Sequence, residues 1–377
     1  MPLSRRSLLG SAAGVAGAVT FEALSQSSAS ASTGRKSGPP VVISAAPNTY
    51  QQNLFNAYSN SGVGWTGADS TYSACLPGGR EMWIFSDTLL GPVNPDGTRP
   101  QDTQFLNNSL VIQQGNRLST VTGGTPQART NIFQPETPGN WYWTGSGIVT
   151  GQVWQQIVIE FKRTGSGMWD FAYADSKLAR VRIDRLNHSI DYTLLPSQAP
   201  TKSFAAWVQR LGAFTYIYGV EDLGLVKYMH IARVSGDDLR RPWSFWTGSG
   251  WSASVADSTR VMANISNEYS VTPWRGRYLL ITHDTAELFS SHIVAYVGDT
   301  PVGPFTDKTA IYTTPETGLF GSYGNANIIT YNSHLHPELS TDSRLLITYN
   351  VNTLDSTLLY QDVSIYRPRF VDVVLAR

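Results

Sequence analysis

The clearest pattern along the chain is a short apolar strand that ends on a polar residue and recurs with variations. The first copy reads Trp83-Ile84-Phe85-Ser86-Asp87, and the copies are spaced 59 to 75 residues apart. A β-rich unit that repeats along a chain is typical of a propeller, in which each repeat forms one blade. We therefore predict an all-β fold, a five-bladed β-propeller, with repeats that end at Asp87, Lys162, Glu221, Asp284 and Asn350.

The segments that precede the repeated strands predict hairpins. An example is the run from Asp69 to Leu76, which leads into the turn Pro77-Gly78-Gly79. In an antiparallel hairpin, the start of the first strand lies beside the end of the second strand. We therefore expect the following pairs to gather on one rim of the propeller: Asp69 with Asp87, Glu268 with Asp284, and Asn327 with Asn350.

Helical periodicity is nearly absent from the sequence. The best candidate for a helix, residues 202–211, also fits a strand. The chain contains 33 glycines, 20 prolines, 18 tyrosines and 11 tryptophans, spread throughout its length. This distribution is typical of short strands joined by tight turns, and it supports the all-β prediction.

The N-terminal residues have the pattern of an export signal. Arg5 and Arg6 precede a mildly apolar run, and Ala29-Ser30-Ala31 has the small residues of a cleavage site. The apolar run is too short to span a membrane. We expect secretion through a twin-arginine signal peptide. The predicted divisions are the signal over residues 1–31, a flexible segment over 32–45 and one propeller domain over 46–377.

Charge and cysteine content narrow the classes of partner. Lysine and arginine total 28 residues, as do aspartate and glutamate, so electrostatics do not favour a nucleic-acid or membrane partner. Cys75 is the only cysteine, which excludes an internal disulfide. We expect a monomer that requires no cofactor, and the sequence leaves open a structural cation such as calcium.

Asp69 and Asp87 are the leading candidates for chemistry. Residues that face one another across paired strands have Cβ atoms about 5 Å apart, so the two carboxylates would repel each other. Glycoside hydrolysis needs two carboxyl groups, one ionised and one protonated. Glu221 and Glu268 are candidates for the general acid on the same rim. The alternative is that the aspartates cap turns and the glutamates are solvated on loops.

Aromatic and polar residues near the rim are candidates for substrate binding. Tryptophan rings stack on the C–H faces of sugars, although most propeller aromatics pack between blades instead. His336 lies two residues after His334 in a predicted loop, where a hydrogen-bonded histidine is favoured over a metal ligand. The predicted substrate-binding residues are Trp65, Trp143, Trp207, Asn108, Asp284, Asn327, His336 and Asn350.

Three other chemistries lack their sequence signals. The chain contains no G-x-S-x-G elbow and no Walker A motif. Residues 62–67 match G-x-G-x-x-G, but they open a predicted strand rather than a helix. A serine hydrolase of the usual type, a P-loop enzyme and a dinucleotide-binding enzyme are therefore not favoured.

One stretch resembles a known family. Between Gly64 and Gly91 the chain has an acid soon after a glycine, a short strand, a glycine turn and an aromatic-aliphatic strand that closes on Asp-Thr. This pattern resembles secreted actinobacterial five-bladed propellers of the class that includes endo-D-arabinofuranosidases, glycoside hydrolase family 183. Residues 332–352, with His-Pro-Glu and Tyr-Asn, also fit that class, and the chain is similar, more distantly, to the arabinanases and xylosidases of family 43.

The resemblance implies roles for the acidic residues. Asp69 and Asp87 match the two N-terminal acids of the family and would be the catalytic pair. Family 43 enzymes take their acid from a later blade, a role that Glu221 or Glu268 would fill here. Ala68 and Ser86 depart from the expected glycine or threonine, which bears on subfamily and substrate.

We therefore predict a secreted glycosidase that cleaves a furanose-containing polysaccharide, of which cell-wall D-arabinan is the leading example. Asp69 is the expected nucleophile or base, and Asp87 its acid partner or orienting neighbour. The alternatives are a glycan-binding propeller without convergent carboxylates, and a polysaccharide lyase. A lyase needs a cationic group that neutralises a uronate, and the sequence has no basic cluster near the rim.

Overall fold

The computed structural model describes residues 38–376 except 168, 169, 198 and 200. The predicted signal peptide lies outside the described residues. Strands take up 51% of the structure and helices 6%, and the sheets are antiparallel, so the all-β prediction is confirmed. No helix in the described part of the chain is long and apolar enough to cross a membrane.

The main sheets follow one another along the chain. The first has the order β3-β4-β7-β8 (Tyr72–Leu76, Arg80–Phe85, Ser109–Gln114, Arg117–Val121). The next is β11-β12-β13-β14 (Trp141–Thr150, Val153–Arg163, Phe171–Arg182, Asp191–Leu194). It is followed by β15-β16-β17-β18-β19 (Lys202–Leu211, Phe214–Asp222, Lys227–Ser235, Trp243–Trp246, Trp251–Ser252), in which β20 (Met262–Ala263) also pairs with β17.

The chain then forms the sheet β21-β22-β23-β24 (Tyr269–Trp274, Arg277–His283, His292–Gly298, Thr306–Thr313). The last sheet is β1-β27-β26-β25 (Val41–Pro47, Pro368–Ala376, Leu345–Thr353, Ile328–Leu335). Two smaller sheets are β2-β5-β6 (Trp65–Ala68, Thr88–Leu90, Phe105–Leu106) and β9-β10 (Gly123–Thr125, Ala128–Thr130). Helices are short: α1 (Thr49–Ser59), α2 (Leu358–Gln361) and the 3₁₀ turns Val255–Asp257 and Pro337–Leu339.

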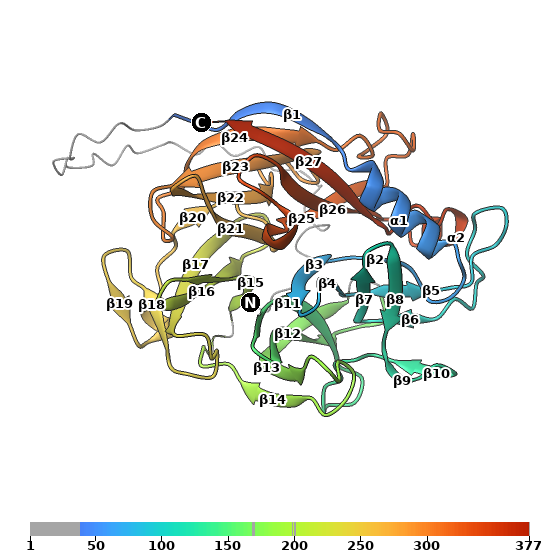
Figure 1. Cartoon of the computed structure of the whole chain (residues 1–377), viewed down its shortest axis with the longest axis horizontal. Helices are drawn as coiled ribbons and strands as arrows, with labels where there is room; N and C mark the ends of the chain where they lie inside the picture. Colours follow the sequence, from blue (N-terminus) through green and yellow to red (C-terminus); the bar gives the residue numbers. More distant parts are fainter. Residues whose placement is uncertain (1–37, 168–169, 198, 200, 377) are drawn as a thin grey trace.

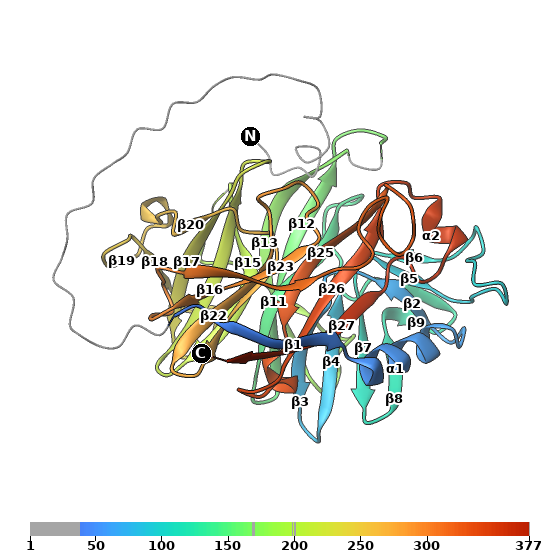
Figure 2. The ribbon, with the colours of Figure 1, turned by 90° about the horizontal axis from the view of Figure 1, so that it is seen from above.

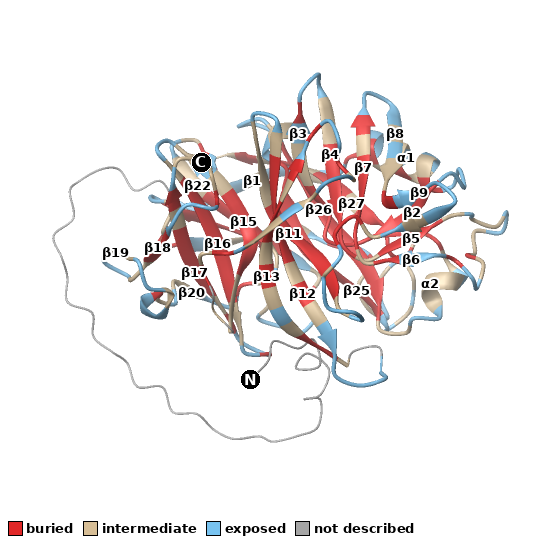
Figure 3. Ribbon diagram, turned by 90° about the horizontal axis from the view of Figure 1, so that it is seen from below, coloured by how far each residue is buried: buried red, intermediate tan, exposed pale blue. Residues whose placement is uncertain are grey.

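The main sheets surround a central axis, which is the arrangement of a β-propeller. Figure 1 shows the first strands β3, β11, β15, β21 and β25 near the centre, and consecutive first strands contact one another from β3 through to β25. The repeated segments of the sequence lie in or directly after the second strands β4, β12, β16, β22 and β26. Buried residues follow these strands through the molecule (Figure 3). The polar ends of the second strands therefore face one rim.

The N-terminal strand closes the last sheet. β1 pairs with the C-terminal strand β27, from Val41 opposite Ala376 to Pro47 opposite Val371, and the two strands run side by side in Figures 1 and 2. Residues 41–45 were expected in a flexible segment, so this expectation needs correction. Strand β27 would otherwise present unpaired backbone N–H and C=O groups, and β1 satisfies them.

Helix α1 was not predicted from the sequence. The Asn48 side chain caps it by accepting a hydrogen bond from the Gln51 N–H at 2.9 Å. Phe55 is its main buried apolar residue, and it packs edge-on against Trp65 and Trp83. A helix with so few apolar contacts shows a weak 3.6-residue pattern. The segment that did suggest a helix, residues 202–211, forms strand β15.

The rim opposite Asp87 contains a second pair of carboxyl groups. Glu81 lies at the start of β4, and burial followed by the nearby charge of Glu338 raises the pKa of Glu81 to about 7. Burial also raises the pKa of Glu338, whose carboxylate accepts a hydrogen bond from Ser73. The folded protein therefore holds the Glu81 proton more tightly than the unfolded chain does.

This shift predicts that stability falls as the pH rises from about 4.5 to 7, because the unfolded chain releases the Glu81 proton first in that window. The Glu81→Gln variant should therefore melt a few degrees above the wild type at pH 8 and close to it at pH 4.5. Thermal melts across this range test the prediction. Glu136→Gln, at an exposed acid, is the control, and an equal Tm difference at both pH values would contradict the linkage.

Candidate active site

Asp69 and Asp87 are neighbours through their backbones, as the hairpin argument predicted. The Asp69 N–H donates to the Asp87 carbonyl at 3.2 Å, and the Ser86 N–H donates to the Asp69 carbonyl at 3.1 Å. The chain turns sharply after Asp69, because Ser70 and Thr71 have left-handed φ angles of 70° and 47°. Such a conformation costs about 1–3 kcal/mol in a non-glycine residue, so its surroundings must hold it.

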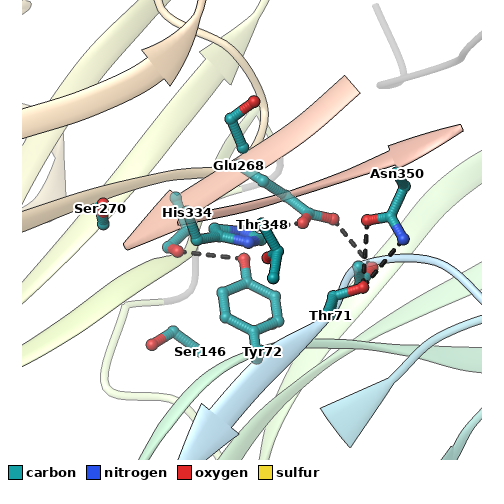
Figure 4. A network of polar contacts seen from close by, with 12 residues as sticks. Thr71, Tyr72, Ser146, Glu268, Ser270, His334, Thr348 and Asn350 are labelled. Carbon is teal, nitrogen blue, oxygen red and sulfur yellow. Dashed lines mark hydrogen bonds and ion pairs between the residues drawn. The ribbon is translucent and has the colours of Figure 1, made fainter. Parts of the chain in front are cut away.

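Asn350 holds this turn. Its side-chain amide donates to the Ala68 carbonyl at 3.1 Å and to the Thr71 hydroxyl at 2.8 Å. Asn350 has no exposed surface, and Figure 4 shows it beside Thr71. It was expected to contact substrate. The correction is that Asn350 supports the Asp69 turn from beneath.

Asp69 is 1% exposed, and its carboxylate is hydrogen-bonded to Tyr331, which is partly exposed. The Tyr331 hydroxyl donates to Asp69 Oδ2 at 2.6 Å, and the Asn352 amide donates to the Tyr331 hydroxyl at 2.9 Å. A hydroxyl–carboxylate bond of this length is in the charge-assisted range. Asp69, Tyr331 and Asn352 therefore form one polar chain.

Asp87 is held as an acceptor. Its Oδ1 accepts hydrogen bonds from Asn107 Nδ2 at 3.0 Å and from Trp143 Nε1 at 2.5 Å. Both donors are N–H groups, and this pairing stabilises an ionised carboxylate. Trp143 was predicted to lie at the site, and the structure places it there as a donor to Asp87.

Glu268 comes from the loop before β21 and points toward His334, as Figure 4 shows. Its Oε1 accepts from the Ser70 hydroxyl at 2.9 Å, and its Oε2 lies 3.0 Å from His334 Nε2. His334 has no exposed surface, and burial lowers the pKa of its imidazole to about 3. The ring is therefore neutral at neutral pH and does not stabilise a carboxylate as a cation would.

Three pockets meet around these carboxyl groups. The inner pocket, of about 100 Å³, is lined by residues that include Ser70, Tyr72, Trp143 and Glu268. The loop pocket, of about 360 Å³, is lined by residues that include Lys227, Glu268, Asp284, Leu288, Tyr331 and Asn352. The aromatic pocket, of about 530 Å³, is lined by residues that include Asp87, Asn107, Trp141, Trp143, Phe171 and Asn352.

The pockets share residues and so adjoin one another. Glu268 lines the inner and loop pockets, Trp143 the inner and aromatic pockets, and Asn352 the loop and aromatic pockets. The buried Asp69 is bonded to residues of all three regions, through its neighbour Ser70, through Tyr331 and through Asp87. The geometry thus brings together Asp69, Asp87 and Glu268, three of the four acids predicted from the sequence.

Glu221, the fourth predicted acid, lies apart from this group. Its carboxylate accepts hydrogen bonds from Arg260 at 2.7 and 3.3 Å and lies 3.3 Å from His230. The hydrogen bond from Arg260 lowers the pKa of Glu221, which is the wrong direction for a general acid. Glu221 also lines none of the three pockets, so its assignment as an acid is corrected to a structural ion pair.

Two of the predicted tryptophans are unavailable to a ligand. Trp65 is 0% exposed and packs against Phe55 and Phe85 in the core. Trp207 is 7% exposed, and its ring lies 6.4 Å from the ring of His334. Both residues pack between elements, which was the alternative considered for propeller aromatics.

Two predicted polar residues are also internal. The amide of Asn108 donates at 3.0 Å to the carbonyl groups of Phe133 and Tyr142, and so ties two sheets together. His336 is 1% exposed and hydrogen-bonds to Ser73 and Thr348. Neither reaches a pocket named above, so both substrate-binding predictions are corrected.

The last two predicted substrate-binding residues, Asp284 and Asn327, differ in outcome. Asp284 lines the loop pocket, and both of its carboxylate oxygens accept from Lys308 at 2.9 Å. Asn327 is exposed and lies opposite Leu354, because β26 continues past Asn350. The residue that faces Asn350 is Tyr331, which the sequence argument missed.

Among the described residues there is no group of three or more His, Cys, Asp or Glu side chains placed to hold a metal ion.

Comparison with known families gives one match over most of the chain. Residues 52–374 match the family described as Domain of unknown function (DUF5005). The chain belongs to this family. No curated protein matches the sequence.

Solved structures add a likeness of fold. A crystal structure from Bacteroides ovatus, provisionally described as a hydrolase, has a TM-score of 0.74 and 18% sequence identity, and covers 87% of this chain and 90% of its own. The DUF5005 chain therefore shares its fold. A family 117 glycoside hydrolase from Zobellia galactanivorans has a TM-score of 0.48 and 10% identity, with 82% and 84% of the two chains covered. That second likeness is too weak to define the fold further.

Proposed function

We propose that this protein is a secreted glycoside hydrolase, built as a five-bladed propeller, that cleaves a furanose-containing polysaccharide such as D-arabinan. The supporting observation is the convergence of Asp69, Asp87 and Glu268 where three pockets meet. The resemblance of residues 64–91 to glycoside hydrolase family 183 supports the sugar class. The export pattern of the first 31 residues supports secretion.

In the proposed mechanism, Glu268 is the general acid and donates its proton to the leaving oxygen. Asp69 is the base, and it acts through Tyr331, because the phenol is its route to the pocket. A water molecule attacks the anomeric carbon and gives a proton to Tyr331 as the Tyr331 proton passes to Asp69. Asp87, held ionised by two N–H donors, stabilises the positive charge that develops on the sugar.

A lyase is less well supported by the charges around the site. Lys227 donates to the Gly224 carbonyl at 2.8 Å and lies 3.4 Å from Asp222, and Lys308 is paired with Asp284. These two cations are already neutralised, and Arg163, which lines the aromatic pocket, lies over the ring of Trp141. A lyase needs a cation that neutralises the uronate carboxylate. Three carboxyl groups close together are unfavourable, because like charges repel one another. A module that only binds glycans has no need for such an arrangement.

The direct test is an assay of the purified protein on arabinan, arabinogalactan and xylan, with measurement of new reducing ends. We expect release from a furanose-containing glycan, and at least a tenfold loss in Asp87→Asn. Glu221→Gln, which changes an acid outside the pockets, should keep the wild-type rate. Binding of these glycans without hydrolysis by the wild type would instead favour the binding module.

A further inference from the structure

The loop pocket has an apolar opening that the proposed chemistry does not explain. Leu225 and Leu288 line this pocket, yet they are 59% and 52% exposed. Leu223 and Val226, in the same β16–β17 turn as Leu225, are also exposed. We call Leu225 and Leu288, the two of these side chains that line the pocket, the apolar rim. Exposed aliphatic side chains at a cavity are a candidate site for an apolar ligand.

Charged side chains that line the loop pocket are paired with opposite charges of the protein. Lys227 is paired with Asp222, and Asp284 with Lys308, as described above. His283 is neutral at neutral pH, since burial lowers its pKa to about 4, and it hydrogen-bonds to Ser333 and the Ser290 carbonyl. Glu287 lies at the solvent edge. Apart from the proposed acid Glu268, the charged groups of the interior are therefore paired and offer little to an ionic ligand.

Hydrogen bonds hold the first residues of the loop that carries Leu288. The Asp284 N–H donates to the His292 carbonyl at 2.9 Å, and the Ala286 N–H donates to Asp284 Oδ1 at 3.1 Å. Phe289, next to Leu288, has a left-handed φ of 54°, which is rare for an aromatic residue.

The loop pocket adjoins the proposed catalytic residues. Glu268 lines the loop pocket as well as the inner pocket, and Tyr331 lines the loop pocket. A substrate held at these two residues therefore reaches the loop pocket beside the apolar rim. We propose that the loop pocket binds an uncharged aliphatic chain carried by the substrate, so that the preferred substrate is a glycan bearing an alkyl or acyl chain.

This inference rests on the proposed function for the sugar part of the substrate, but binding tests it without catalysis. Calorimetry would compare methyl and octyl D-arabinofuranosides, with the octyl compound below its micelle concentration. We expect the octyl compound to bind more tightly, by up to about fourfold per buried methylene, with a negative heat-capacity change. Equal affinities for the two compounds would overturn the inference.

Two substitutions locate the effect. Leu225→Ser and Leu288→Ser should lower the octyl-to-methyl affinity ratio at least threefold each, because each removes part of the apolar rim. Leu319→Ser is the matched control, since Leu319 is 57% exposed and lies outside the three pockets. A ratio unchanged in both rim variants would reject this site even if octyl binding is tight.

Rates separate failure of the inference from failure of the proposed function. If the protein hydrolyses arabinofuranosides and kcat/KM rises from methyl through butyl to octyl, both proposals stand. If it hydrolyses them with equal kcat/KM, the aliphatic site is rejected and the glycosidase remains. If neither these arabinofuranosides nor the polysaccharides of the screen are hydrolysed but octyl binding depends on Leu225 and Leu288, the aliphatic site stands and the glycosidase is rejected. An octyl glycoside and an octanoyl ester of methyl arabinofuranoside would distinguish an alkyl aglycone from an acylated sugar.

Discussion

Replacing Glu268 with glutamine should lower kcat/KM on a natural glycan by about 10²- to 10⁴-fold, the usual contribution of a general acid. Glutamine keeps the shape of the side chain and its contact with Ser70, but it has no proton to donate to a leaving oxygen. The loss should depend on the leaving group. An aryl glycoside with an acidic phenol needs little protonation, so its hydrolysis should fall far less than that of the polysaccharide.

The pH profile gives a second readout for Glu268. If its proton is used in the reaction, the alkaline limb of the wild-type profile reports its loss, and this limb should disappear in Glu268→Gln. Glu221→Gln should keep the wild-type limb and rate, because Arg260 already holds that carboxylate ionised. Equal losses on aryl and natural substrates, with the alkaline limb retained, would contradict the acid role of Glu268.

The location of these acids was predictable because it follows from local rules. The apolar strand before Asp87 and the hairpin after Asp69 need only a turn and antiparallel pairing to bring the two residues together. Glu268 follows by the same argument in a later sheet. Glu221 also ends an apolar strand at this rim, but it forms an ion pair with Arg260 instead of joining the other acids. Arg260 comes from a loop that no sequence pattern connects to Glu221.

Burial was harder to predict than position. Trp65 and Trp207 look suited to sugar stacking, but composition does not tell which tryptophans face a pocket and which fill the space between sheets. The strand β26 was expected to end at Asn350, the polar residue that closes its repeat. Asn350 and Asn352 are instead both buried within β26, where side-chain partners satisfy them. The longer strand changes the register, so that Tyr331 rather than Asn327 lies opposite Asn350.

The second large effect concerns Asp69 and Tyr331. Asp69→Asn should lower kcat/KM by about 10²-fold or more, the contribution expected of a general base, because the amide cannot accept a proton at neutral pH. Tyr331→Phe should cause a similar loss, since it removes the hydroxyl through which the buried carboxylate reaches the loop pocket. Steady-state kinetics on the glycan identified by the screen would measure both losses.

The double variant distinguishes a relay from two separate contributions. If the two residues transfer one proton in sequence, the double variant should be no slower than the slower single variant, because residues that act as a unit are not additive. Tyr58→Phe is the matched control. It also removes a hydrogen-bonded tyrosine hydroxyl, at 2.7 Å from Thr120, but outside the pockets, and should retain activity. Multiplied losses in a double variant that melts normally would show that Tyr331 and Asp69 work independently, and would leave the buried carboxylate without a route to the substrate.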